Sequence, residues 1–120
     1  MKTIIHVDNS EFFRKLMKTF FAEQGFMGEV FSQGADALQA IKQGDVVVVI
    51  TGMALADMDG DEFIKRVLTS SYKGSIIVLT SNDPEAEQKI LSLTGVTAYI
   101  PKSGAWEEAL LHQLYQCLDL

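Results

Sequence analysis

The sequence has few residues that crosslink or interrupt a chain, with one cysteine, Cys117, and two prolines among 120 residues. A single cysteine excludes an internal disulfide and a metal site built from cysteines, and it is typical of a reducing compartment. Basic residues are outnumbered by acidic ones, 10 to 16, and the net charge of −6 disfavours direct binding to nucleic acid. No apolar run is long enough to span a bilayer, and MKTIIHVDN lacks the apolar core and cleavage site of a signal peptide. We therefore expect a cytoplasmic protein.

Apolar residues make up 48% of the chain and charged residues 22%, which is ordinary for a globular protein. With no linker, repeat or low-complexity segment, the sequence predicts one domain, residues 1–120. Short apolar runs alternate with segments of helical periodicity. The predicted strands are Thr3–Val7, Glu29–Ser32, Val46–Ile50, Ser75–Thr80 and Thr97–Ile100. The predicted helices follow them at about 11–24, 35–43, 61–69, 84–94 and 105–118.

The central stretch is DVVVVITGMALADMDG, residues 45–60. Its five consecutive apolar residues, Val46 to Ile50, predict a strand that is buried on both faces, as in the middle of a parallel sheet. Alternating strands and helices favour such a sheet with helices on both faces. In open parallel sheets, ligands and chemistry gather beyond the carboxyl ends of the strands. At this strand end the sequence offers Ile, Thr and Gly, and no carboxylate.

Four motifs occur in order along the chain: VDNS at 7–10, MDG at 58–60, IIVLTS at 76–81 and AYIPKS at 98–103. With these motifs the whole chain resembles a response regulator receiver domain of the chemotaxis-regulator type. The resemblance implies a flavodoxin-like, doubly wound, five-stranded parallel sheet of order 2-1-3-4-5 with five helices. It also implies a part in two-component (phosphorelay) signalling.

In that family an aspartate after the third strand accepts a phosphoryl group, and two acids after the first strand hold Mg²⁺. By position, Asp8 matches one acid of that pair, and Asn9 stands where the second should be. A Thr or Ser after the fourth strand and a Lys after the fifth complete the site, and Thr80 and Lys102 match these. Counting back from MDG places the phosphoacceptor position of the family at Gly52. Counting forward from residue 45 places it at Ile50, and Thr51 lies between the two.

None of these three positions carries a carboxylate, although aspartyl phosphate chemistry requires one as the nucleophile. The resemblance therefore implies a pseudo-receiver, which keeps the fold without the phosphorylation chemistry. We expect no cofactor, and only weak residual Mg²⁺ binding at Asp8, because Mg²⁺ is usually held by carboxylates and phosphate oxygens. The alternative is a structural role, in which Asp8 accepts hydrogen bonds from the following loop and forms an ion pair with Lys102, and Thr80 is an ordinary turn residue. His6 is expected to be a hydrogen-bonded core histidine.

Two other functions remain open. A displaced acceptor such as Asp57 would give a phosphorylatable receiver. A haloacid-dehalogenase-type phosphatase would use Asp8 as nucleophile, although Ser10 stands where that family has a second Asp. We expect a non-enzymatic domain that binds a protein partner or a fused output domain.

Tyr99 occupies the position of the family's switch aromatic residue. An ordinary strand residue without a switching role is an equally supported interpretation. The last helix carries a wide apolar stripe, for which ordinary core packing is the competing interpretation. We expect a partner surface, and a possible homodimer contact, on the face of the fourth helix, fifth strand and fifth helix. The expected partner residues are Trp106, Leu110, Leu111, Leu114 and Tyr115.

Overall fold

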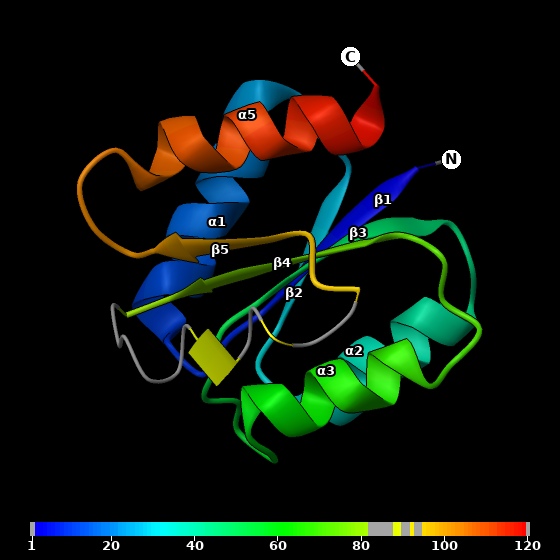
Figure 1. Cartoon of the computed structure of the whole chain (residues 1–120). Helices are drawn as coiled ribbons and strands as arrows, with labels where there is room; N and C mark the ends of the chain where they lie inside the picture. The colour runs from blue at the N-terminus through cyan, green and yellow to red at the C-terminus, as the bar shows by residue number, and fades with distance from the viewer. Residues whose placement is uncertain (1, 82–87, 90–91, 93–94, 120) are drawn as a thin grey trace.

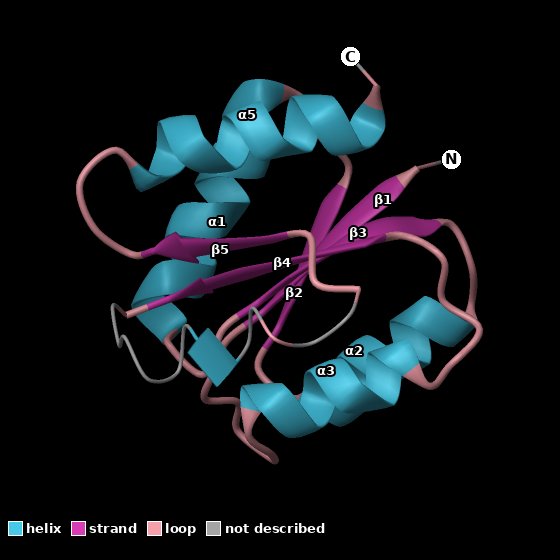
Figure 2. Ribbon diagram, in the orientation of Figure 1, coloured by secondary structure: helices cyan, strands magenta, loops and turns pink. Residues whose placement is uncertain are grey.

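The computed structural model describes residues 2–81, 88–89, 92 and 95–119. Five strands form one parallel sheet of order β2-β1-β3-β4-β5, as the sequence predicts. Helices α1 and α5 cover one face of the sheet, and α2 and α3 cover the other (Figures 1 and 2). The strands are β1 (Thr3–Val7), β2 (Gly28–Phe31), β3 (Val46–Thr51), β4 (Ser75–Thr80) and β5 (Ala98–Pro101). The helices are α1 (Glu11–Gln24), α2 (Gly34–Lys42), α3 (Gly60–Leu68) and α5 (Trp106–Leu118).

Most predicted boundaries lie within one or two residues of the observed ones. The fourth predicted helix, at 84–94, falls largely outside the described residues. None of the helices in the described part of the chain is long and apolar enough to cross a membrane.

Helix α1 begins and ends where local chemistry dictates. Ser10 has an extended backbone, and its hydroxyl accepts a hydrogen bond from the Phe13 N–H at 3.1 Å. Glu11 places a negative charge in the first turn, where the helix dipole favours it. At the other end Gly25 adopts φ 74°, a left-handed conformation that glycine tolerates best. These two ends fix how the chain leaves β1 and returns to β2.

Strand β3 lies at the centre of two apolar layers. Val48, Val49 and Ile50 are fully buried, which confirms the prediction of a strand covered on both faces. Because side chains alternate along a strand, Val48 and Ile50 pack with α1 and α5, whereas Val49 packs with α2 and α3. The sheet is therefore held between its helices, and the carboxyl ends of its strands open on one edge.

Candidate functional site

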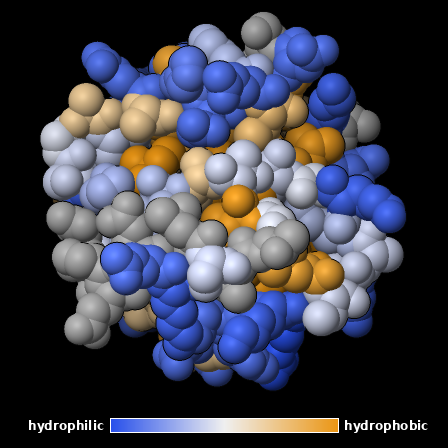
Figure 3. All heavy atoms as spheres, viewed as in Figure 1, coloured by the Kyte–Doolittle hydropathy of each residue, from blue (hydrophilic) through white to orange (hydrophobic). Residues whose placement is uncertain are grey.

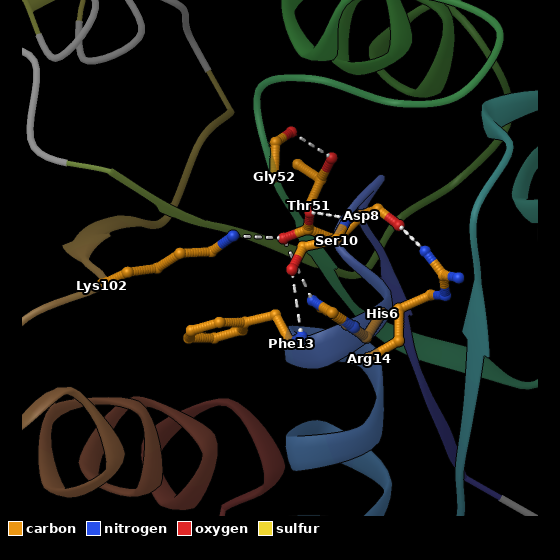
Figure 4. A network of polar contacts seen from close by, with 8 residues as sticks. All are labelled: His6, Asp8, Ser10, Phe13, Arg14, Thr51, Gly52 and Lys102. Carbon is orange, nitrogen blue, oxygen red and sulfur yellow. Dashed lines mark hydrogen bonds and ion pairs between the residues drawn. The ribbon is translucent and has the colours of Figure 1, made fainter.

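The strand ends meet as parallel pairing requires. Val7 of β1 lies opposite Thr51 of β3, and the N–H of Gly52 donates to the Val7 carbonyl at 2.9 Å. On the other side Thr80 lies opposite Pro101, and the N–H of Lys102 donates to the Thr80 carbonyl at 2.7 Å. This register gathers Asp8, Thr51, Gly52 and Lys102 into one polar cluster, which we call the pocket because it lies where receiver domains carry their phosphorylation site (Figure 4).

The pocket is dominated by one ion pair. The ammonium Nζ of Lys102 lies 2.6 Å from Oδ2 of Asp8, whose side chain is only 5% exposed, against 16% for Lys102. The other carboxylate oxygen, Oδ1, accepts the backbone N–H of Ser10 at 2.9 Å. Lys102 also lies over the ring of Phe13, 4.2 Å from its centroid. The predicted pair of Asp8 and Lys102 is thus confirmed, and both carboxylate oxygens have partners.

The surroundings keep Asp8 ionised. Burial of the carboxyl group acts to raise its pKa, but His6, the Lys102 ammonium and the Ser10 N–H together hold that pKa below its ordinary value. The guanidinium of Arg14 donates to the Asp8 backbone carbonyl at 2.8 Å and fixes the chain at this point. Asp8 is therefore a paired, structurally held anion.

His6 lies directly below this pair. Its side chain is fully buried, as predicted, but neither ring nitrogen has a hydrogen-bond partner among the described residues. The expectation of a hydrogen-bonded histidine is therefore wrong, because Nε2 stops 3.8 Å short of Oδ2 of Asp8. Burial lowers the pKa of His6, more than the nearby Asp8 carboxylate raises it. The imidazole is neutral, and the cost of removing it from water is not offset by a hydrogen bond.

The acceptor position is a glycine, Gly52, and the side chain of Asp8 lies directly against it. A Cβ atom added to Gly52 would lie 2.8 Å from Oδ2 of Asp8, closer than real Cβ contacts. The hydroxyl of the neighbouring residue, Thr51, is fully buried and donates to the Gly52 carbonyl at 2.8 Å. A side chain at position 52 would therefore require the Asp8 carboxylate to shift.

The remaining predicted residues of the site are Asn9, Thr80 and Tyr99. Asn9 is exposed, and its N–H donates to the Ala54 carbonyl at 3.0 Å. Thr80 is half-buried at the end of β4 and contributes its backbone carbonyl to Lys102. Tyr99 is half-buried, and its hydroxyl reaches the Ser81 carbonyl at 3.4 Å. The structure therefore brings together four of the predicted pocket residues, and leaves Asn9 facing solvent.

Asp57 has a role that the sequence did not reveal. Its two carboxylate oxygens accept the backbone N–H groups of Gly34 at 2.6 Å and Ala35 at 3.0 Å. These bonds cap the start of α2, where Gln33 at the cap position forms no side-chain bond. The backbone bonds, from Ala35 first, hold the pKa of Asp57 below its ordinary value. The missing cap at Gln33 was the one available signal that another residue must serve α2.

The predicted partner surface on α5 requires a correction. Leu110 and Leu114 are fully buried and pack in the core with α1, so they cannot contact a partner. Trp106 is half-buried against α1, its ring centroid 4.9 Å from that of Phe13. Leu111 is half-buried, whereas Tyr115 is 44% exposed. The apolar stripe is wide because α5 packs on both the sheet and α1. The outer side of α5 is largely hydrophilic, with some weakly hydrophobic residues between (Figure 3).

The donor atoms present do not fit Mg²⁺. Among the described residues no group of three or more His, Cys, Asp or Glu side chains is placed to hold a metal ion. The pocket offers one carboxylate, and that carboxylate already holds Lys102. A Mg²⁺ ion would have to displace this ammonium and would gain only one charged ligand.

Comparison with known proteins agrees with the geometry. Residues 4–115 match the family model described as response regulator receiver domain. The chain is 28% identical to the transcriptional regulatory protein GltR of Pseudomonas aeruginosa, over 91% of the chain and 46% of GltR. It is 27% identical to the chemotaxis protein CheY of Halobacterium salinarum, over 84% of each.

Solved structures show the same likeness. The chemotaxis response regulator CheY4 of Vibrio cholerae superposes with a TM-score of 0.83 and 27% identity, over 98% of each chain. The signal receiver domain of an HD domain-containing protein from Pseudomonas fluorescens Pf-5 gives a TM-score of 0.86 at 23% identity, which shows the fold. The chain spans about half the length of GltR, and most of the length of both CheY proteins. The chain belongs to the response regulator receiver domain family of two-component signalling.

Proposed function

We propose that this receiver domain does not accept a phosphoryl group and that it signals by binding other proteins. The observation that carries the proposal is the acceptor position, where Gly52 supplies no carboxylate and the Asp8 carboxylate lies beside it. Aspartyl phosphate chemistry needs an accessible carboxylate nucleophile. The pocket has one carboxylate, on a side chain that is 5% exposed, with both oxygens engaged.

A fixed site has consequences for signalling. In a phosphorylatable receiver, Lys102 would respond to charge arriving at the end of β3. Here Asp8 already supplies that charge from the end of β1, so Lys102 stays in one arrangement. A switch needs a ligand that favours one state over another. Regulation therefore comes from a protein partner or a fused output domain, or from the abundance of the protein, in the cytoplasm and without catalysis or direct contact with nucleic acid.

The two competing functions are less well supported. Asp57, the displaced acceptor considered from the sequence, uses both carboxylate oxygens on the N–H groups of α2. Phosphorylation there would release the start of that helix. Asp8 as a phosphatase nucleophile would have to leave Lys102 and the Ser10 N–H while almost fully buried.

Intact-protein mass spectrometry tests the proposal. The wild-type chain is incubated with acetyl phosphate and Mg²⁺, and we expect no added phosphoryl group. The matched variant Asn9→Asp/Gly52→Asp restores the missing carboxylates and, if circular dichroism shows it folded, should gain a phosphoryl group that hydroxylamine removes. A hydroxylamine-labile phosphoryl group on the wild type would contradict the proposal, and peptide mapping would then identify the acceptor.

Magnesium titration is the second measurement. We expect wild-type Mg²⁺ affinity in the millimolar range or weaker, because Asn9 adds no charge and Asp8 is engaged. Titration calorimetry should show tighter binding by Asn9→Asp/Gly52→Asp. Micromolar affinity in the wild type would show that the ion pair opens readily and that the site is not fixed.

A further inference from the structure

The β2 strand forms an open edge of the sheet. Strand β2 pairs with β1, and no other strand pairs with it in the described part of the chain. The carbonyls of Met27 and Phe31 accept the N–H groups of Ile4 and Asp8, at 2.9 and 3.0 Å. Because alternate residues of a strand direct their backbone groups to the same side, Gly28 and Val30 turn their N–H and C=O groups away from β1. Two donors and two acceptors therefore face outward.

Two hollows lie next to α2, and both reach Glu29 of this edge; the smaller one extends from Glu29 over Ile5 of β1 to Val46 of β3. They have volumes of about 280 and 230 Å³ and share Glu29, Ala40 and Gln43. The larger one is also lined by Phe31 and Asp36. Neither Glu29 nor Asp36 forms an ion pair with another described residue, and no Lys or Arg lines either hollow. This side of the edge is negatively charged, whereas the Val30 side packs with the apolar layer of α1.

We infer that the β2 edge binds an extended segment of a partner protein, whose lysine or arginine side chains at alternate positions face Glu29 and Asp36. Such a segment would add a sixth strand, bonded to the outward groups of Gly28 and Val30. Its basic residues would lie beside Glu29 as cross-strand neighbours, and its apolar residues would lie beside Val30. The inference rests on the proposed protein-binding function and names one surface for it.

The charges select this occupant over a second copy of the chain. In an antiparallel pairing of two β2 strands through Gly28 and Val30, Glu29 would lie directly opposite Glu29 of the other copy. Like charges in that position are destabilising, and each chain carries a net charge of −6. A basic extended segment replaces this repulsion with attraction.

The test uses the whole chain, labelled with ¹⁵N, without phosphodonor. The probe is the capped peptide acetyl-Val-Lys-Val-Lys-Val-amide, and the control peptide has Glu in place of Lys. On adding the probe we expect slower hydrogen exchange at the Gly28 and Val30 amides. The Glu29 and Phe31 amides, which face β1, should change little. The acidic peptide should have no effect.

Variants separate edge binding from general attraction. Glu29→Lys should weaken probe binding at least about fivefold. Glu108→Lys makes the same charge change on exposed α5 and should leave binding nearly unchanged. Val30→Pro removes one outward N–H, a change that edge strands tolerate, and should also weaken binding.

Three results would overturn the inference. One is an absence of binding at millimolar peptide, and another is an equal loss in Glu29→Lys and Glu108→Lys. The third is protection of the Gly28 and Val30 amides that rises with protein concentration without peptide, which would make a second copy the occupant. Phosphorylation of the wild type would overturn the proposed function but would not alter this titration, so the two failures are distinguishable.

Discussion

The pocket at the strand ends and the β2 edge use their polar groups in opposite ways. In the pocket, Asp8 has Lys102 on one oxygen and the Ser10 N–H on the other, and its carboxylate lies against Gly52. At the edge, Gly28 and Val30 turn their backbone groups outward beside two acidic hollows. Under the proposed function, the strand-end position serves to hold the fold, and new polar contacts form along β2.

The largest effect is expected from removing the ion pair of the pocket. Lys102→Ala leaves Asp8 with its charge buried and uncompensated, so we expect a loss of about 1–3 kcal/mol in the free energy of unfolding. Urea denaturation of the wild type, Lys102→Ala, Asp8→Ala and the double variant gives the coupling energy. Lys15→Ala, which removes an exposed pair with Glu11, should have little effect. A coupling indistinguishable from zero would show that the pocket is not held by this pair.

A second test concerns the unpaired histidine beneath the pocket. Burial lowers the pKa of His6 in the native state, whereas the unfolded chain binds a proton below about pH 6.5. The unfolded state therefore binds more protons, and stability should fall as the pH drops from 7 to 5.5. Urea midpoints should show this fall in the wild type and in His112→Gln, and should lose most of it in His6→Leu. An unchanged slope in His6→Leu would mean that another group titrates.

The smallest effect is expected at Asp57, which caps the start of α2. Asp57→Ala removes the acceptor of two N–H groups at the start of α2, and losing such a cap costs about 1 kcal/mol or less on an exposed helix end. Hydrogen exchange at Gly34 and Ala35 should become faster. Because the pKa of Asp57 is lowered, this contribution is present above about pH 4 and is lost as the pH falls further. Asp36→Ala serves as the control, since Asp36 lies in the same turn of α2.

The sheet was predictable because its signals are local. The valine run at 46–50 indicated a buried strand, and the order of strand ends then brought Asp8 and Lys102 together, 94 residues apart. The cap from Asp57 to Gly34 spans 23 residues and depends on the path of a loop, which no local pattern encodes. The predicted hydrogen bond of His6 does not form because Nε2 and Oδ2 of Asp8 are less than 1 Å too far apart, a difference that a sequence cannot reveal.

The error on α5 has a different origin. Periodicity shows which residues of a helix are apolar, but not whether a sheet, a neighbouring helix or a partner covers them. Leu110 and Leu114 are covered within the chain, because α1 and α5 lie side by side on the same face of the sheet (Figure 1). The width of an apolar stripe is therefore weak evidence for a binding surface when two helices share a layer.

The position of Lys102 over the Phe13 ring has a spectroscopic consequence. With the ammonium 4.2 Å from the ring centroid, the adjacent ε-methylene protons lie in the shielding cone of the aromatic ring current. Their proton resonances should shift upfield from those of lysines in solvent for as long as the ion pair stays closed. The chemical shift of one methylene group thus reports, without any substitution, how much of the time the pocket is shut.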